Sequence, residues 1–188
     1  MRTVMLVLGG ARSGKSHFAR EYAWRSGGRV LFVATATAGD EDMRRRIEKH
    51  KQDRPADWHT LEAVTDIGKQ IEANAGDAQL IVIDCITLLV NNIFCRYDEK
   101  LFDTIEDEVL EHAVTIEIEQ LQQCLKKVNA SFVIVSNEVG LGLVPDNRMG
   151  RLYRDILGRA NQMLAQTADE VYLMVSGIPV MIKPGHQS

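Results

Sequence analysis

Apolar and polar positions along this chain form two kinds of segment that alternate. Short runs rich in Val, Ile and Leu recur without the in-and-out alternation of a half-exposed strand, which is typical of strands buried on both faces of a parallel sheet. These runs are residues 3–8, 30–34, 80–84, 132–136 and 171–175. A last run, residues 180–183, follows Ser176-Gly177-Ile178-Pro179. A tight turn at that point predicts an antiparallel hairpin at the edge of the sheet.

The segments between these runs have helical patterns. A helix is predicted from Ser16 to Arg25, ending at the glycine pair 27–28. Asp40 can cap a second helix that runs through His50. Two further helices are predicted at residues 101–128 and 151–168. The longer one has an apolar stripe of Phe102, Ile105, Val109, Ala113 and Ile116, continued by Leu121 and Leu125. This alternation predicts an α/β fold, a mostly parallel sheet flanked by helices.

Bulk properties narrow the class of protein. The 188 residues suit one domain, residues 1–188. A formal charge of −4 gives no basic footprint, so nucleic acid is not an expected partner. No apolar run approaches the roughly 20 residues of a membrane span, and we expect a cytoplasmic protein. Cys85, Cys95 and Cys124 form no CxxC pair, so buried free thiols are expected.

The first strand leads into a complete Walker A motif, Gly9-Gly10-Ala11-Arg12-Ser13-Gly14-Lys15-Ser16. Gly9 and Gly14 lack the Cβ that would keep backbone N–H groups away from phosphate oxygens. Lys15 is expected to reach the β- and γ-phosphates, and the Ser16 hydroxyl to bind Mg²⁺. The motif predicts a site for ATP or GTP that serves phosphoryl or nucleotidyl transfer.

A carboxylate completes the predicted phosphate site. Asp84 ends the apolar run Leu80-Ile81-Val82-Ile83, which is the Walker B pattern. A carboxylate at the tip of such a strand holds Mg²⁺ directly or through water. A strand-terminal cap is the other interpretation of this aspartate, and the P-loop favours the metal role.

Further segments resemble one enzyme family over nearly the whole chain. They are Ala34-Thr35-Ala36-Thr37, the stretch from Arg46 to Pro55 with Trp58, Asp84-Cys85-Ile86-Thr87, Ser136-Asn137-Glu138-Val139-Gly140, Ala168-Asp169-Glu170-Val171 and Val175-Ser176-Gly177-Ile178-Pro179. Together with the P-loop they closely resemble the bifunctional adenosylcobinamide kinase / adenosylcobinamide-phosphate guanylyltransferase family. The resemblance implies phosphorylation of the aminopropanol hydroxyl of adenosylcobinamide, then transfer of GMP from GTP with release of pyrophosphate. It also implies a RecA-like P-loop fold assembled as a homotrimer.

The resemblance assigns residues as well. His50 would be the nucleophile that carries GMP as a phosphoramidate, which suits an imidazole that is mostly neutral at cellular pH. A histidine at this helical spacing can also be a packed structural residue, and the flanking pattern favours the nucleophile. The resemblance places Ala34, Thr35, Ala36, Lys51, Gln52, Asp53, Arg54 and Glu62 at positions that contact GTP. The family often has glutamate at the position of Asp84, where the shorter side chain would serve Mg²⁺ through water.

Two segments keep alternative roles. Glu138 follows a buried strand at the edge where ligands bind in open α/β sheets, so it would position Mg²⁺, water or substrate. The apolar loop 140–145 would meet the corrinoid or a neighbouring subunit. The sequence leaves two questions open: whether the kinase and transferase steps share one nucleotide pocket, and whether ATP or GTP is the phosphoryl donor.

Two other classes of function are weaker. A motor or DNA-handling ATPase is disfavoured by the acidic balance and by the lack of DNA-binding extensions. A GTPase-like switch would carry an Asn-Lys-x-Asp guanine motif, and the sequence has none. A covalent GMP adduct at His50 would separate the transferase from both.

Overall fold

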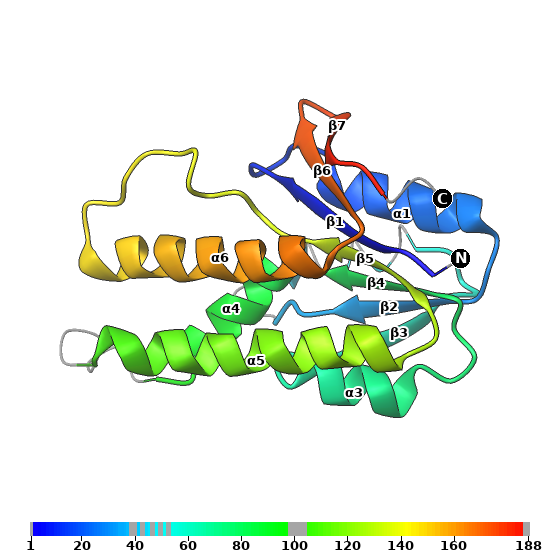
Figure 1. Ribbon diagram of the computed structural model, residues 1–188, viewed down its shortest axis with the longest axis horizontal. Helices are drawn as coiled ribbons and strands as arrows, with labels where there is room; N and C mark the ends of the chain where they lie inside the picture. The colour runs from blue at the N-terminus through cyan, green and yellow to red at the C-terminus, as the bar shows by residue number, and fades with distance from the viewer. Residues whose placement is uncertain are drawn as a thin grey trace.

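The computed structural model describes residues 2–37, 41, 44–45, 48, 51, 54–97 and 105–185. Within them a seven-stranded sheet has the order β3-β2-β4-β5-β1-β6-β7 (Figure 1). All neighbouring strands are parallel except the last pair, β6 and β7. The strands are β1 Val4–Gly9, β2 Val30–Ala34, β3 His59–Glu62, β4 Leu80–Asp84, β5 Ser131–Val135, β6 Glu170–Val175 and β7 Ile178–Lys183. The predicted α/β fold with a mostly parallel sheet and an antiparallel edge hairpin is confirmed.

Helices cover both faces of the sheet, as Figure 1 shows. Helix α1 lies on one face, and α3, α4, α5 and α6 lie on the other. Their bounds are α1 Lys15–Ser26, α3 Ile67–Asn74, α4 Ile86–Phe94, α5 Asp107–Lys127 and α6 Arg148–Thr167. Of the helix predicted after Asp40, the structure describes five residues, and these are helical. No described helix has the length and apolar character needed to cross a membrane.

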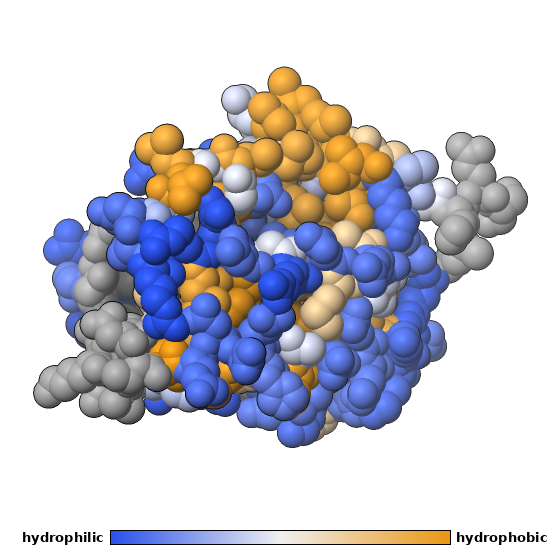
Figure 2. Space-filling view, turned by 60° about the vertical axis from the view of Figure 1, so that its left-hand side comes forward, coloured by the Kyte–Doolittle hydropathy of each residue, from blue (hydrophilic) through white to orange (hydrophobic). Residues whose placement is uncertain are grey.

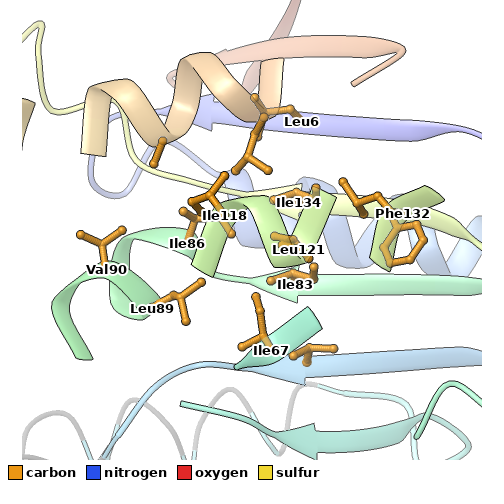
Figure 3. Close-up of a cluster of buried hydrophobic side chains, with 14 of the residues drawn as sticks. Leu6, Ile67, Ile83, Ile86, Leu89, Val90, Ile118, Leu121, Phe132 and Ile134 are labelled. Carbon is orange, nitrogen blue, oxygen red and sulfur yellow. The ribbon is translucent and has the colours of Figure 1, made fainter. Parts of the chain in front are cut away.

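The core has two parts because adjacent strand residues point to opposite faces. Leu6, Ile83 and Ile134 belong to the larger cluster under α3 to α6 (Figure 3). Their neighbours along the strands, such as Val7 and Val133, pack against α1. With both faces covered, the central strands are apolar at every position, which explains the continuous runs in the sequence.

The apolar stripe predicted for the long helix is only partly right: Ile105 and Ala113 pack against the core, but two of its other residues are out of phase. Val109 and Ile116 are 43% and 39% exposed, whereas Leu110, Val114 and Ile118 are buried against the sheet. Two apolar stripes run along α5 one residue apart in sequence, so spacing alone did not decide which one faces the core. Leu121 and Leu125 are buried as predicted, while residues 101–104 lie outside the described part of the chain.

Three elements were not predicted, and each lacks the pattern used for prediction. Strand β3 is an edge strand whose residues His59, Thr60 and Glu62 are exposed. Helix α4 is buried almost all round, so it has no polar face to give a period. Helix α3 has eight residues, which is too short for a helical period to stand out in the sequence. The cysteine expectation also needs correction, because Cys124 is buried but Cys95 is exposed and Cys85 is partly exposed.

Candidate active site

The Walker A segment forms a loop between β1 and α1, and the edge hairpin supports it. Gly9 and Gly14 have φ of 150° and 97°. A Cβ on Gly9 would lie 2.7 Å from both the Met174 carbonyl oxygen and Ser13 Oγ. Gly177 N, in the hairpin turn, donates to the Ser13 carbonyl oxygen at 2.9 Å. Both glycines therefore allow an approach that a side chain would block, and β6–β7 holds the loop from outside.

Lys15 lies over this loop. Its side chain is 7% exposed, and Nζ donates to the Gly10 carbonyl oxygen at 2.7 Å. A second contact, to Ser13 Oγ, is 3.5 Å. Burial lowers the pKa of Lys15, while the negative charge of the nearby Asp84 acts in the opposite direction. The ammonium group is thus held where the β- and γ-phosphates of a nucleotide would lie over a P-loop.

The two residues predicted to bind Mg²⁺ lie side by side. Ser16 Oγ, in the first turn of α1, donates to Asp84 Oδ1 at 3.2 Å. Asp84 ends β4, next to Ala34 on β2 and Val135 on β5. One hydroxyl and one carboxylate beside a phosphate loop fit Mg²⁺, which takes one or two protein oxygens and completes its shell with phosphates and water.

The segment after β2 is fixed by side chains rather than left open. The Thr35 side chain is fully buried, and its hydroxyl donates to the Cys85 carbonyl oxygen at 2.7 Å. The same hydroxyl accepts from Cys85 N at 2.8 Å, and Asn92 Nδ2 donates to the Thr35 carbonyl oxygen at 2.8 Å. Ala34 and Ala36 are half-buried. Contact with a nucleotide here would therefore involve these two residues and not the threonine hydroxyl.

Arg54, in the β2–β3 connection, lies near Asp84. The Arg54 guanidinium lies 3.9 Å from the centroid of the Phe32 ring, and burial lowers its pKa. The negative charge of Asp84 acts against burial and raises the pKa of Arg54, which requires the two groups to be near each other. Arg54 Nε is buried and has no hydrogen-bond partner among the described residues.

Glu62 and Lys51 form an exposed pair. Lys51 Nζ lies 2.7 Å from Glu62 Oε1. The hydrogen bond from Lys51 lowers the pKa of Glu62, and the same bond raises the pKa of Lys51. His50, Gln52 and Asp53, which were predicted as nucleophile and GTP contacts, lie outside the described residues.

Sequence reasoning missed Arg20 and the residues that fix the loops. The Arg20 charge lowers the pKa of Arg54, so it adds to the positive field of the site. Its position one helical turn after Ser16 is a signal that could have indicated it. Asn92 gave no such signal, because its contact with Thr35 spans 57 residues. A cavity of about 240 Å³ lined by residues Arg12 to His17 marks the phosphate side of the site.

Comparison with known proteins gives a consistent result. A family model described as cobinamide kinase / cobinamide phosphate guanyltransferase matches residues 5–182. The chain is 41% identical to the bifunctional adenosylcobalamin biosynthesis protein CobU of Escherichia coli K12, over 96% of this chain and 99% of that protein. It is 42% identical to the CobU of Salmonella typhimurium LT2, with the same coverage. It is 37% identical to the bifunctional protein CobP of Pseudomonas aeruginosa, over 95% of this chain and 96% of that protein. A crystal structure of the RadB recombinase aligns at TM-score 0.47 and 13% identity over 91% of this chain and 73% of its own.

Proposed function

The chain belongs to the cobinamide kinase / cobinamide phosphate guanyltransferase family, and on that premise we propose that it carries out two reactions through a GMP–histidine intermediate. It first phosphorylates adenosylcobinamide with a nucleoside triphosphate. It then transfers GMP from GTP to adenosylcobinamide phosphate, giving adenosylcobinamide-GDP and pyrophosphate. The observation that carries the proposal is the P-loop with Lys15 buried over it and Ser16 bonded to Asp84.

The kinase step depends on positioning and charge more than on covalent chemistry. Lys15 and the loop N–H groups would hold the β- and γ-phosphates, and Arg54 would add charge beside Asp84. Ser16 and Asp84 would hold Mg²⁺, which would supply positive charge that offsets the charge of the phosphates. ATP and GTP both present the triphosphate that this loop would hold.

The transferase step would use His50 as nucleophile. An imidazole nitrogen attacks the α-phosphorus of GTP, a P–N bond forms, and the bond between the α-phosphorus and the bridging oxygen breaks to release pyrophosphate. The ring gives up its N–H proton to solvent. A phosphate oxygen of adenosylcobinamide phosphate then attacks the same phosphorus and the P–N bond breaks. Lys51 and Arg54, on the same β2–β3 connection, would bind the triphosphate, and Glu62 the guanine edge.

The test is incubation with GTP labelled at the α-phosphate. We expect a labelled protein whose label is lost in acid and kept in base, as a phosphoramidate requires, and which maps to the peptide that contains His50. His50→Ala should form no adduct and transfer no GMP, while it keeps phosphorylation of cobinamide at least in part. Label on His59, or appreciable GMP transfer by His50→Asn, would contradict the assignment.

We also propose a homotrimer, with a cytoplasmic location as the accompanying prediction. The apolar residues Val114 and Ile118 of α5 are buried within the chain, so they offer no surface to a partner. Support comes instead from the edge hairpin, where apolar side chains gather at the top of the molecule (Figure 2). Val175, Ile178, Val180, Met181 and Ile182 are 45% to 65% exposed there. A strand edge this apolar favours contact with another chain. Light scattering should give three chains per particle, and a monomer at micromolar concentration would contradict the proposal.

A further inference from the structure

The loop after β5 starts at the centre of the catalytic edge. Val135, the last residue of β5, lies level with Asp84 on β4 and with Val7 on β1. Since β4 carries the metal carboxylate and β1 leads into the P-loop, residues 136–138 begin between the two. The reacting γ-phosphate of a bound nucleotide has to lie at that same place.

The backbone of these three residues is fixed on every side. Hydrogen bonds tie it to the P-loop strand, to α4 and to α6. They are Ser136 N to the Val7 carbonyl oxygen at 3.0 Å, Asn137 N to Thr87 Oγ1 at 2.8 Å, Asn161 Nδ2 to the Asn137 carbonyl oxygen at 3.0 Å, and Glu138 N to the Gly9 carbonyl oxygen at 3.0 Å. Glu138 is therefore anchored to the first residue of the Walker A motif. A carboxylate carried on a backbone held by so many bonds starts from a preorganised position, as a catalytic group requires.

Only one of the two Glu138 carboxylate oxygens accepts a hydrogen bond from the described residues. Oε1 accepts from Gly140 N at 2.7 Å, which fixes the orientation of the group. Within the described part of the chain no cation pairs with it, whereas the nearby Arg154 pairs with Asp155 at 3.3 Å and Arg159 pairs with Glu111. The second oxygen, Oε2, has no recorded partner among the described residues. A carboxylate with this arrangement can accept a proton.

A cavity of about 620 Å³ lies beside this carboxylate. It runs from the end of β1 to the middle of α6, and Leu8, Glu138, Gly158 and Gln162 are among its lining residues. Its volume is in the range of small-molecule sites. It is separate from the cavity along residues 12–17, so a nucleotide held there leaves this one open to a second substrate. Its polar lining suits an amide-linked arm that ends in a hydroxyl.

We propose that this cavity receives the alcohol arm of the acceptor, and that Glu138 is the general base of the kinase step, an inference that rests on the proposed function. The acceptor O–H gives its proton to Glu138 Oε2. The oxygen then attacks the γ-phosphorus, and the bond from that phosphorus to the β–γ bridging oxygen breaks to release the nucleoside diphosphate. Glu138 returns its proton to solvent after the product leaves. GMP transfer needs no such base, because the acceptor phosphate is already an anion.

Glu138→Gln separates the two reactions. The glutamine keeps an oxygen for Gly140 N, so the loop retains its bond, but it cannot take a proton. General-base catalysis is worth about 10²- to 10⁴-fold, so we expect kinase kcat to fall at least about 100-fold, with little change in the KM for nucleotide. GMP transfer to supplied cobinamide phosphate should stay within a few-fold of wild type. Glu170→Gln is the matched control. Glu170 is the first residue of β6 and pairs with Met5 near the start of β1, so it lies at the end of the strands away from the P-loop.

The pH dependence of kcat/KM gives a second readout. The acid limb of the wild-type kinase profile, where a carboxylate base becomes protonated, should be absent from Glu138→Gln. A kinase loss under about tenfold, or an equal loss of both activities, overturns the proposal, the second in favour of a purely structural role. If wild-type protein makes no cobinamide phosphate at all, the proposed function fails, and this result is distinct from a kinase that is active with either residue.

Discussion

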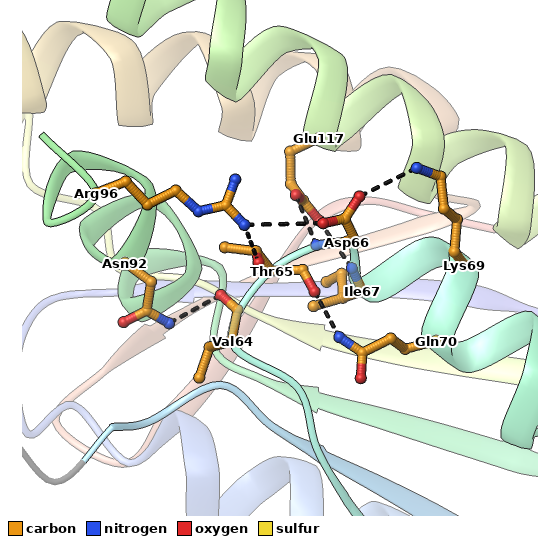
Figure 4. A network of polar contacts seen from close by, with 9 residues as sticks. All are labelled: Val64, Thr65, Asp66, Ile67, Lys69, Gln70, Asn92, Arg96 and Glu117. Carbon is orange, nitrogen blue, oxygen red and sulfur yellow. Dashed lines mark hydrogen bonds and ion pairs between the residues drawn. The ribbon is translucent and has the colours of Figure 1, made fainter.

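Glu117 gives the sharpest test of how the fold holds its catalytic loops. This α5 carboxylate is 5% exposed, and it accepts from Asp66 N and Ile67 N, both at 2.8 Å (Figure 4). The two N–H groups begin α3, which has no side-chain cap of its own. Glu117 therefore supplies the cap from another helix. It fixes the turn that leads out of β3, the strand that carries Glu62.

The cost of removing this carboxylate follows from the two bonds. A hydrogen bond to a charged group contributes about 1.5–3 kcal/mol, and a buried donor left without a partner adds a desolvation cost. Glu117→Ala should therefore lower the free energy of unfolding by roughly 3–5 kcal/mol. For a chain of this size each kcal/mol shifts Tm by about 2–4 °C. Glu117→Gln should cost less, about 1.5–3 kcal/mol, because its amide oxygen can serve one donor while its NH₂ opposes the other.

Urea unfolding followed by circular dichroism measures both variants. Glu119→Ala, two residues along α5 and exposed, is the control and should stay within about 0.5 kcal/mol of wild type. If Glu117→Ala lost less than about 1 kcal/mol, or matched Glu119→Ala, the capping argument would be refuted.

Two further predictions concern the P-loop and the thiols. Lys15→Ala should lower kinase activity by about two orders of magnitude or more with the fold intact, because the charge at the β- and γ-phosphates is lost; near-normal turnover in a folded protein would defeat this role. Burial, and next the charge of Asp84, raises the pKa of Cys85 to about 11, and burial, then Glu72, raises that of Cys124 to about 12. Iodoacetamide at pH 8 should therefore modify exposed Cys95 first, and mass mapping that found Cys85 labelled at an equal rate would contradict the burial argument.

The parts of the fold that were predictable depend on contiguous sequence. The P-loop could be identified from the sequence because phosphate binding needs glycines, a lysine and a serine at fixed spacing in one turn. The central strands could be identified because both of their faces are covered, which makes them continuous apolar runs in the sequence. The hairpin was predictable too, because Ser176-Gly177 is a pair that suits a tight two-residue turn. The structure shows the left-handed φ values that such a turn needs, 52° at Ser176 and 85° at Gly177.

What could not be predicted depends on contacts between distant segments. The phase of α5 was decided by the sheet beneath it, because Val109 and Leu110 both belong to apolar stripes at helical spacing. Polar networks are a second example. Asn92 Nδ2 bonds to the carbonyl oxygens of Thr35 and Val64, residues 57 and 28 positions away, and so ties together the exits of β2 and β3. A single asparagine in an apolar helix gives no sign of such partners until the fold is known.

The arrangement along the sheet edge gives a physical reason why one chain can carry two phosphorus chemistries. The P-loop follows β1, Asp84 ends β4 and Glu138 follows β5, and these are three adjacent central strands whose ends are bonded to one another. Lys51 and Arg54 belong instead to the connection between β2 and β3, toward the edge of the sheet, where their contacts are an exposed ion pair and an aromatic ring. Changes after β5 should therefore affect phosphoryl transfer and leave GMP transfer, whereas a change at Lys51 should weaken GMP transfer more than phosphoryl transfer. Changes in the P-loop should affect phosphoryl transfer, and their effect on GMP transfer tests whether the two reactions share this loop.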